Sequence, residues 1–135
     1  MKSKKSKKTY FGKDTLYIKK ELVTELLRGC KNAYPKEFFA MLSSESRTAI
    51  DHYIVVPLFY QTENAISYRT DLLPMGYKIS GTIHSHPSGI NRPSNADLRS
   101  FINLGSFHII VGYPFSLENI ACYDYTGKPI TLILI

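Results

Sequence analysis

The sequence has 135 residues and a mass of 15.4 kDa, which is enough for one domain of ordinary size and too little for two. Hydrophobic residues make up 44% and charged residues 21%, a composition that excludes a chain disordered throughout. The net charge of +6 and the pI of about 9.3 point at first to an anionic partner such as nucleic acid.

The excess charge lies in one terminal run. Residues 1–13 hold six lysines and no acidic residue, which leaves 11 of the 17 basic residues against 11 acidic residues in residues 14–135. We therefore expect a lysine-rich disordered tail over residues 1–13 and a single, formally neutral domain over residues 14–135. The tail has no aromatic residue among its first nine positions. Any binding of nucleic acid by this tail would therefore be non-specific and salt-dependent, and a solubilising role is favoured.

The sequence does not favour export or membrane insertion. No apolar segment of 7–15 residues follows the lysines, as a signal peptide would require. No stretch approaches the ~18 apolar residues of a membrane span. We expect a cytoplasmic protein without a membrane partner.

Hydrophobic periodicity predicts the elements in chain order. A short strand is predicted at residues 15–18 and a helix at residues 20–33, where Leu22, Leu26 and Cys30 recur at helical spacing before Pro35. Further strands are predicted at residues 37–42, 48–59, 65–69, 79–84, 107–113, 120–125 and 130–135, with a turn at 43–47, a loop at 87–93, a second helix at 94–103 and a turn at 126–129.

These elements do not alternate strictly as β-α-β units, and a hairpin closes the chain. This order predicts an α+β fold with a mixed, mainly antiparallel sheet and two main helices packed against it.

Residues 81–97, GTIHSHPSGINRPSNAD, carry the most informative pattern. His84 and His86 are two residues apart, so on a strand both imidazoles point to the same face. Asp97 follows at the start of the predicted helix. Two imidazoles and one carboxylate are the ligand set of a catalytic zinc site, which keeps a fourth position for water. Ser94 and Asp97 also match a helix-capping box, which by itself would explain both residues, and the two interpretations can hold together.

The spacing H-x-H-x(7)-S-x(2)-D resembles the JAMM motif of the JAMM/MPN+ (Mov34/MPN/PAD-1) zinc metalloproteases. That family also requires an upstream glutamate in a context such as P-x-E-x-x-G. Here residues 35–40 read PKEFFA, so Glu37 matches and Ala40 replaces the usual glycine. The resemblance covers the chain from about Thr15 to the C-terminus and excludes the tail. It implies the cytidine-deaminase-like MPN/JAMM fold.

The resemblance also implies a role for each matched residue. His84, His86 and Asp97 are the implied ligands of one Zn²⁺ per chain. Glu37 is the implied general acid/base, and Ser94 is the implied hydroxyl that stabilises the oxyanion. Glu37 also opens an apolar run, where a charge is expected to need a partner.

The resemblance further implies a compact prokaryotic, archaeal-type isopeptidase or peptidase. Its implied partners are conjugates of a ubiquitin-like or small archaeal modifier, or a sulfur-carrier protein, cut after a C-terminal Gly-Gly. A RadC-like or sulfur-carrier-processing JAMM peptidase, a catalytically inactive MPN scaffold and a tail-driven nucleic-acid-binding protein are the alternatives. A homodimer through a helix or a sheet edge is compatible with the sequence.

Four further residues carry reactive side chains without a motif around them. Cys30 and Cys122 are predicted to be buried thiols, because each lies at an apolar position of its element. His52 and His108 lie in predicted strands, and we expect each of them to be structural, or to contact a metal ligand, rather than to bind the metal itself.

Overall fold

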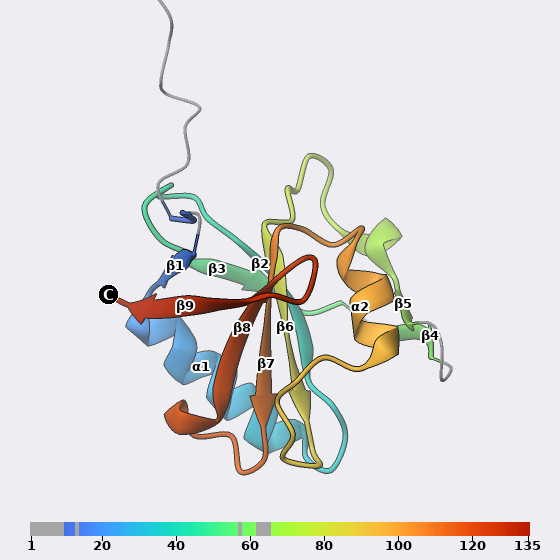
Figure 1. The fold of residues 1–135 in the computed structure, drawn as a ribbon. Helices are drawn as coiled ribbons and strands as arrows, with labels where there is room; N and C mark the ends of the chain where they lie inside the picture. Colours follow the sequence, from blue (N-terminus) through green and yellow to red (C-terminus); the bar gives the residue numbers. More distant parts are fainter. Residues whose placement is uncertain (1–9, 13, 57, 62–65) are drawn as a thin grey trace, which may run out of the picture.

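The computed structural model describes residues 10–12, 14–56, 58–61 and 66–135 (Figure 1). Its elements, in chain order, are β1 (Thr15–Ile18), α1 (Lys20–Ala33), β2 (Phe39–Ser43), β3 (His52–Ile54), β4 (Leu58–Gln61), β5 (Ile66–Tyr68), the 3₁₀ turn η1 (Thr70–Leu72), β6 (Gly81–His86), α2 (Asn95–Phe101), β7 (Phe107–Gly112), the 3₁₀ turn η2 (Leu117–Asn119), β8 (Ile120–Asp124) and β9 (Pro129–Leu134).

Over these described ranges, seven strands form one sheet in the order β1-β9-β8-β7-β6-β2-β3. The pairs β1–β9 and β6–β7 are parallel, and the other four neighbouring pairs are antiparallel. The expected mixed, mainly antiparallel sheet is therefore confirmed. β4 and β5 form a separate antiparallel pair.

α1 covers one face of the sheet (Figure 1). Its side chains Leu22, Leu26 and Cys30 are buried in one cluster with Ile83 of β6 and Ile109 of β7. This cluster is the main hydrophobic core.

α2 lies against the opposite face. Its last residue, Phe101, is buried with Ile110 of β7 and Tyr123 of β8. Since neighbouring residues of a strand point to opposite faces, Ile109 and Ile110 belong to the two different clusters. The expected α+β arrangement of two helices packed against the sheet is thus confirmed.

The prediction of one strand over residues 48–59 is wrong, because two short strands, β3 and β4, lie in this region. β3 pairs with β2 over only three residues, and β4 then leaves the sheet to pair with β5. A segment rich in Ile, Val, Tyr and Phe favours extended backbone, but this composition does not determine which partner a strand takes.

The strand predicted to begin at residue 37 begins two residues further along the chain, at Phe39. Phe38 still pairs with β6, because its carbonyl accepts from the Ser85 N–H at 3.0 Å and its N–H donates to the Ser85 hydroxyl at 2.8 Å. The Ser85 hydroxyl accepts the Phe38 N–H in place of a backbone carbonyl, so regular strand pairing ends here and Glu37 lies just outside β2.

The folded part includes residues 10–12, which the sequence assigned to the tail. Tyr10 is buried, and its hydroxyl donates to Ser80 at 3.0 Å. Phe11 forms a bridge with Leu16 of β1. The tail prediction for residues 1–9 and 13 lies outside the described residues.

Cys30 and Cys122 are free, buried thiols, as predicted. Burial raises the pKa of each thiol to about 12. None of the helices that the structure describes has the length and apolar character needed to cross a membrane.

Candidate metal centre

β6 presents two imidazoles on the face that α2 covers. His84 and His86 lie two residues apart on this strand, and their neighbour Ser85 points to the opposite side, where it meets Phe38. His84 is 4% exposed, and the side chain of His86 is 14% exposed. The histidines therefore reach the site because both belong to one strand and share its parity.

Asp97 enters the same space from the first turn of α2. Its Oδ2 accepts the Ser94 N–H at 2.8 Å, and its own N–H donates to the Ser94 hydroxyl at 3.1 Å. These reciprocal bonds form the capping box that the sequence predicts. The box also fixes the direction of the Asp97 carboxylate, which faces β6.

The three side chains converge on one point. His84 Nε2 lies 3.2 Å from Asp97 Oδ1, and His86 Nε2 lies 3.1 Å from Asp97 Oδ2. The two Nε2 atoms are 3.0 Å apart. One ligand atom from each residue falls within a 4.8 Å cluster. The capping and metal-ligand interpretations of Asp97 are both compatible with this geometry.

Charge and burial act against each other in this cluster. Burial raises the pKa of Asp97, but hydrogen bonds from His84 and His86 outweigh it and hold that pKa far below its usual range. Burial lowers the pKa of His86, whereas the hydrogen bond to Asp97 raises it, and the net pKa is raised. The site therefore stabilises an ionised Asp97 carboxylate beside a positively charged His86 imidazole.

A backbone contact orients His86. Its Nδ1 lies 2.7 Å from the carbonyl oxygen of Ile90. A carbonyl oxygen can accept a hydrogen bond but cannot donate one, so the neutral ring carries its proton on Nδ1. Nε2 then presents a lone pair to the cluster. Sequence reasoning missed this contact, because any residue type supplies a backbone carbonyl.

The donor set fits a divalent cation. When both imidazoles are neutral and point their lone pairs inward, they and the Asp97 carboxylate face one another with no proton between them, and a cation relieves that repulsion. Two imidazole nitrogens and one carboxylate are the three protein ligands of several catalytic zinc sites. His84, His86 and Asp97 would hold the metal.

Glu37 lies at the edge of this site. Phe39 pairs with His84, and continuing the register two residues through Phe38 places Glu37 opposite His86 on the same face. The negative charge of Glu37 contributes to the raised pKa of His86. Glu37 is exposed and water can solvate its charge, so the expectation that this charge needs a partner because it opens an apolar run is wrong.

Ser94 lies beside the cluster as the N-cap of α2. Its hydroxyl oxygen accepts the Asp97 N–H, which leaves the hydroxyl hydrogen available for donation.

The two remaining histidines are not part of this cluster. His108 is fully buried, stacks on Phe101 with ring centroids 3.8 Å apart, and lies 2.7 Å from the Thr82 hydroxyl through Nδ1. Burial, followed by the nearby charge of His84, lowers the pKa of His108 to about 3. His52 is exposed and pairs with Asp51 at 2.8 Å.

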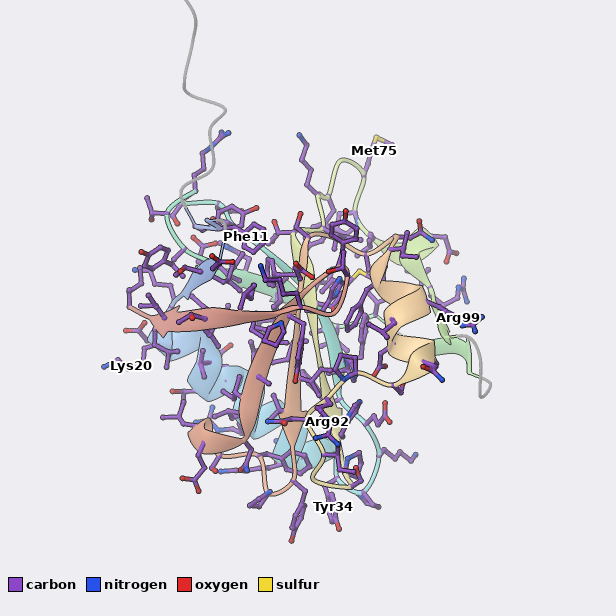
Figure 2. The ribbon with its side chains drawn as sticks, in the orientation of Figure 1. Phe11, Lys20, Tyr34, Met75, Arg92 and Arg99 are labelled. Atoms are coloured by element: carbon purple, nitrogen blue, oxygen red, sulfur yellow. The ribbon has the colours of Figure 1, made fainter. Side chains whose placement is uncertain are left out.

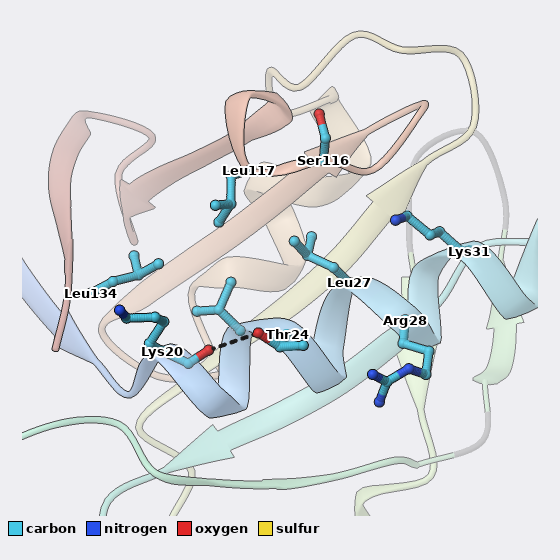
Figure 3. A pocket seen from close by; sticks show the side chains of 9 residues that line it. Lys20, Thr24, Leu27, Arg28, Lys31, Ser116, Leu117 and Leu134 are labelled. Carbon is cyan, nitrogen blue, oxygen red and sulfur yellow. Dashed lines mark hydrogen bonds between the residues drawn. The ribbon is translucent and has the colours of Figure 1, made fainter.

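A separate groove of about 450 Å³ lies between α1, the segment before β8, and β9 (Figure 3). Leu27, Leu117 and Leu134 line it, together with Lys20 and Arg28 (Figure 3). None of these lining residues belongs to the His-His-Asp cluster, so the groove is distinct from the candidate metal centre.

Figure 2 shows where the loop after β6 lies in the molecule. Arg92, on the loop between β6 and α2, and Tyr34, after α1, lie toward the lower end of the view, and the exposed Met75 lies at the opposite end. The loop that follows the two histidines therefore lies away from the 70–78 segment.

A mixed sheet between two helices, with a His-x-His strand facing an aspartate at a helix N-terminus, defines a metalloprotease-like site of the JAMM type. Comparison with known proteins agrees with this class. The family of prokaryotic homologues of the JAB domain matches residues 19–124, so the chain belongs to that family.

Individual relatives support the same assignment. The chain is 32% identical over 111 residues to a probable metalloprotease of Haloferax volcanii, covering 76% of this chain and 68% of the relative. It matches the crystal structure of a JAB1/MPN domain protein from Archaeoglobus fulgidus with a TM-score of 0.70 and 34% identity, over 89% of this chain and 99% of that one. A structure described as a JAMM metalloprotease-like zinc site in the proteasome and signalosome matches with a TM-score of 0.69 and 34% identity, over 88% and 96%.

Proposed function

We propose that this chain is a zinc-dependent isopeptidase or peptidase of the cytoplasm that hydrolyses the bond after the C-terminal Gly-Gly of a ubiquitin-like modifier. The observation that carries the proposal is the convergence of His84, His86 and Asp97 within 4.8 Å. The probable metalloprotease and the zinc-site structure among its relatives support the reaction class. The JAMM-like motif supports the choice of substrate.

Each residue has a distinct task in this mechanism. When bound, Zn²⁺ supplies Lewis acidity and lowers the pKa of a coordinated water to about 7. Glu37 accepts the proton of the attacking water and returns it to the leaving amine. Its exposed position opposite His86 suits this task, since the carboxylate must meet both water and substrate.

Ser94 and the capping box complete the site. The Ser94 hydroxyl donates a hydrogen bond to the oxyanion that develops at the scissile carbonyl, an interaction worth about 2.7–4 kcal/mol in a comparable oxyanion hole. Because the same hydroxyl oxygen accepts the Asp97 N–H, its position is already fixed before substrate binds.

Zinc stoichiometry and cleavage assays test the proposal. We expect about one zinc per chain. The substrates are a ubiquitin-like protein fused in line through its Gly-Gly to a reporter, and the same protein joined to a lysine side chain. Glu37→Ala should retain the metal and lose about 10²–10⁴-fold in cleavage rate. Glu25→Ala, which removes an exposed glutamate from α1, is the matched control.

The two ways of failing are distinguishable. Cleavage by Glu37→Ala at the wild-type rate would refute the assigned proton transfer. Zinc binding by His84→Ala as tight as wild type would refute the metal centre itself. A zinc-loaded wild type that cleaves neither substrate would leave the metal centre standing and refute the choice of substrate.

The tail-driven alternative predicts the opposite pattern. Deleting residues 1–9 removes five of the lysines and spares the buried Tyr10. A peptidase should keep its activity after this deletion. A nucleic-acid-binding protein should instead lose a zinc-independent, salt-sensitive affinity for DNA or RNA.

A further inference from the structure

We propose that Tyr123 is a positioning residue for the metal ligand His86, on which it acts through the loop that follows β6. The proposal rests on the His-His-Asp cluster binding zinc and does not depend on which substrate is cleaved.

The orientation of His86 depends on an exposed loop. Its Nδ1–H donates to the Ile90 carbonyl at 2.7 Å. The Ile90 residue is itself 54% exposed, so core packing does not hold this carbonyl in place. The support must come from the neighbouring residues of the loop.

Asn91 supplies that support on two sides. Its backbone carbonyl accepts the Tyr123 hydroxyl at 2.7 Å, and its side-chain amide donates to the Asn119 carbonyl at 3.0 Å. Asn91 directly follows Ile90, so holding the carbonyl and the side chain of Asn91 restricts the adjoining Ile90–Asn91 peptide, which carries the carbonyl that His86 needs. Both anchors come from β8 and the turn before it.

The two anchors are themselves rigid. Tyr123 is 7% exposed and packs in the cluster of Phe101 and Ile110. The Asn119 side chain accepts from both the N–H and the hydroxyl of Ser116. The loop is therefore held by hydrogen bonds to a buried tyrosine of β8 and to a turn that is itself hydrogen-bonded.

We expect loss of the anchor to alter the orientation and tautomer of His86 while the fold is kept. If the Ile90 carbonyl turns away, the neutral imidazole is free to move its proton to Nε2, where it blocks the metal lone pair. Residues that orient a ligating histidine typically contribute 10–100-fold to metal affinity.

Tyr123→Phe tests this directly, because it removes only the hydroxyl. We expect the zinc dissociation constant, measured by competition with a chelator, to rise about tenfold. In metal-free protein at a pH where His86 is neutral, the imidazole ¹⁵N resonances of His86 should shift from the Nδ1–H form toward a mixture of tautomers. Asn91→Ala removes the second anchor and should produce the same two changes.

Tyr77→Phe is the matched control. Tyr77 is half-buried, and its hydroxyl donates to Ser43 at 3.2 Å and to the Met41 carbonyl at 3.4 Å, on β2. It should leave both readouts at wild-type values. The proposal is overturned if Tyr123→Phe and Asn91→Ala bind zinc within twofold of wild type. It is also overturned if the zinc affinity of these variants falls while the His86 tautomer is unchanged, or if Tyr77→Phe lowers the zinc affinity by the same factor. A wild type that binds no zinc would overturn it together with the metal centre, whereas zinc binding without Gly-Gly cleavage would overturn only the proposed function.

Discussion

Asp97→Asn should destabilise the metal-free protein in a manner that depends on pH. The carboxylate lies 3.1 Å from His86 Nε2 and 3.2 Å from His84 Nε2, and it is almost fully buried. Asparagine has the same shape and keeps one oxygen for the Ser94 N–H, so the substitution removes the charge and leaves the cap.

The direction follows from the two pKa shifts. The pKa of Asp97 is lower in the folded protein than its ordinary value of 3.8, so its stabilisation is present above that value and is lost as the pH falls. The pKa of His86 is raised above 6.5, so its stabilisation is present below 6.5 and is lost as the pH rises through the folded value. The pair therefore stabilises the fold most between about pH 4 and pH 6.5.

The magnitude follows from burial. Breaking a buried charge pair by removing one partner costs about 3–5 kcal/mol, and we take about 3 kcal/mol because asparagine keeps the cap. For a domain of this size that corresponds to a melting temperature lower by about 10 °C at pH 5.5. At pH 8.5, above the ordinary pKa of histidine, less of His86 carries a positive charge, so asparagine should cost less than it does at pH 5.5.

Thermal unfolding with a chelator at pH 5.5 and pH 8.5 measures the difference. Asp14→Asn is the control, since Asp14 pairs with Lys128 at 3.5 Å on the surface and should contribute below about 1 kcal/mol at both pH values. An equal loss of melting temperature for Asp97→Asn at the two pH values would refute the reasoning.

Three further outcomes are expected. In Gly112→Ala, the new Cβ would lie 2.5 Å from the Gly89 carbonyl oxygen, so the loop after β6 must move by about 1 Å at a cost of about 1–3 kcal/mol; chemical unfolding and zinc titration should both show a loss, and unchanged values would contradict the close contact. Cys30 and Cys122, with thiol pKa values of about 12, should resist iodoacetamide at pH 8 until the protein unfolds, and rapid labelling of native protein would contradict their burial. The pKa of His108 falls to about 3, so between about pH 3 and 6.5 the His108 side chain binds a proton only in the unfolded chain. The free energy of unfolding of the metal-free protein should therefore rise with pH by up to about 1.4 kcal/mol per pH unit. His108→Gln should flatten that slope, and an unchanged slope in urea unfolding would exclude a neutral, buried His108.

Strand alternation predicts that His84 and His86 share a face, and the resemblance to the JAMM motif joins Asp97 to them in the candidate metal centre. The alternation of a strand places His84 and His86 on one face, and the structure places both of them on β6. The S-x-x-D pattern located the start of α2, where Ser94 and Asp97 form the capping box. Both signals are local, since each depends on a few consecutive residues and the geometry of one element.

The fold departs from the sequence prediction where distant segments choose partners. β3 and β4 continue one apolar stretch, yet β3 extends the main sheet and β4 pairs with β5. Extended backbone satisfies its hydrogen bonds with any edge that is within reach, so the choice is made by packing and not by the alternation of side chains.

Glu37 shows how much a prediction depends on the reason given for it. The sequence points to Glu37 through its place after the first helix, through its match to the motif, and because a charge that opens an apolar run is expected to need a partner. The structure removes that last reason, because Glu37 is exposed. Continuing the antiparallel register of β2 and β6 beyond the Phe39–His84 pair sets Glu37 opposite His86 and in contact with solvent, which is a better reason. A general base must exchange protons with water and a leaving group, so an accessible carboxylate one strand away from a metal ligand suits the task better than a buried one.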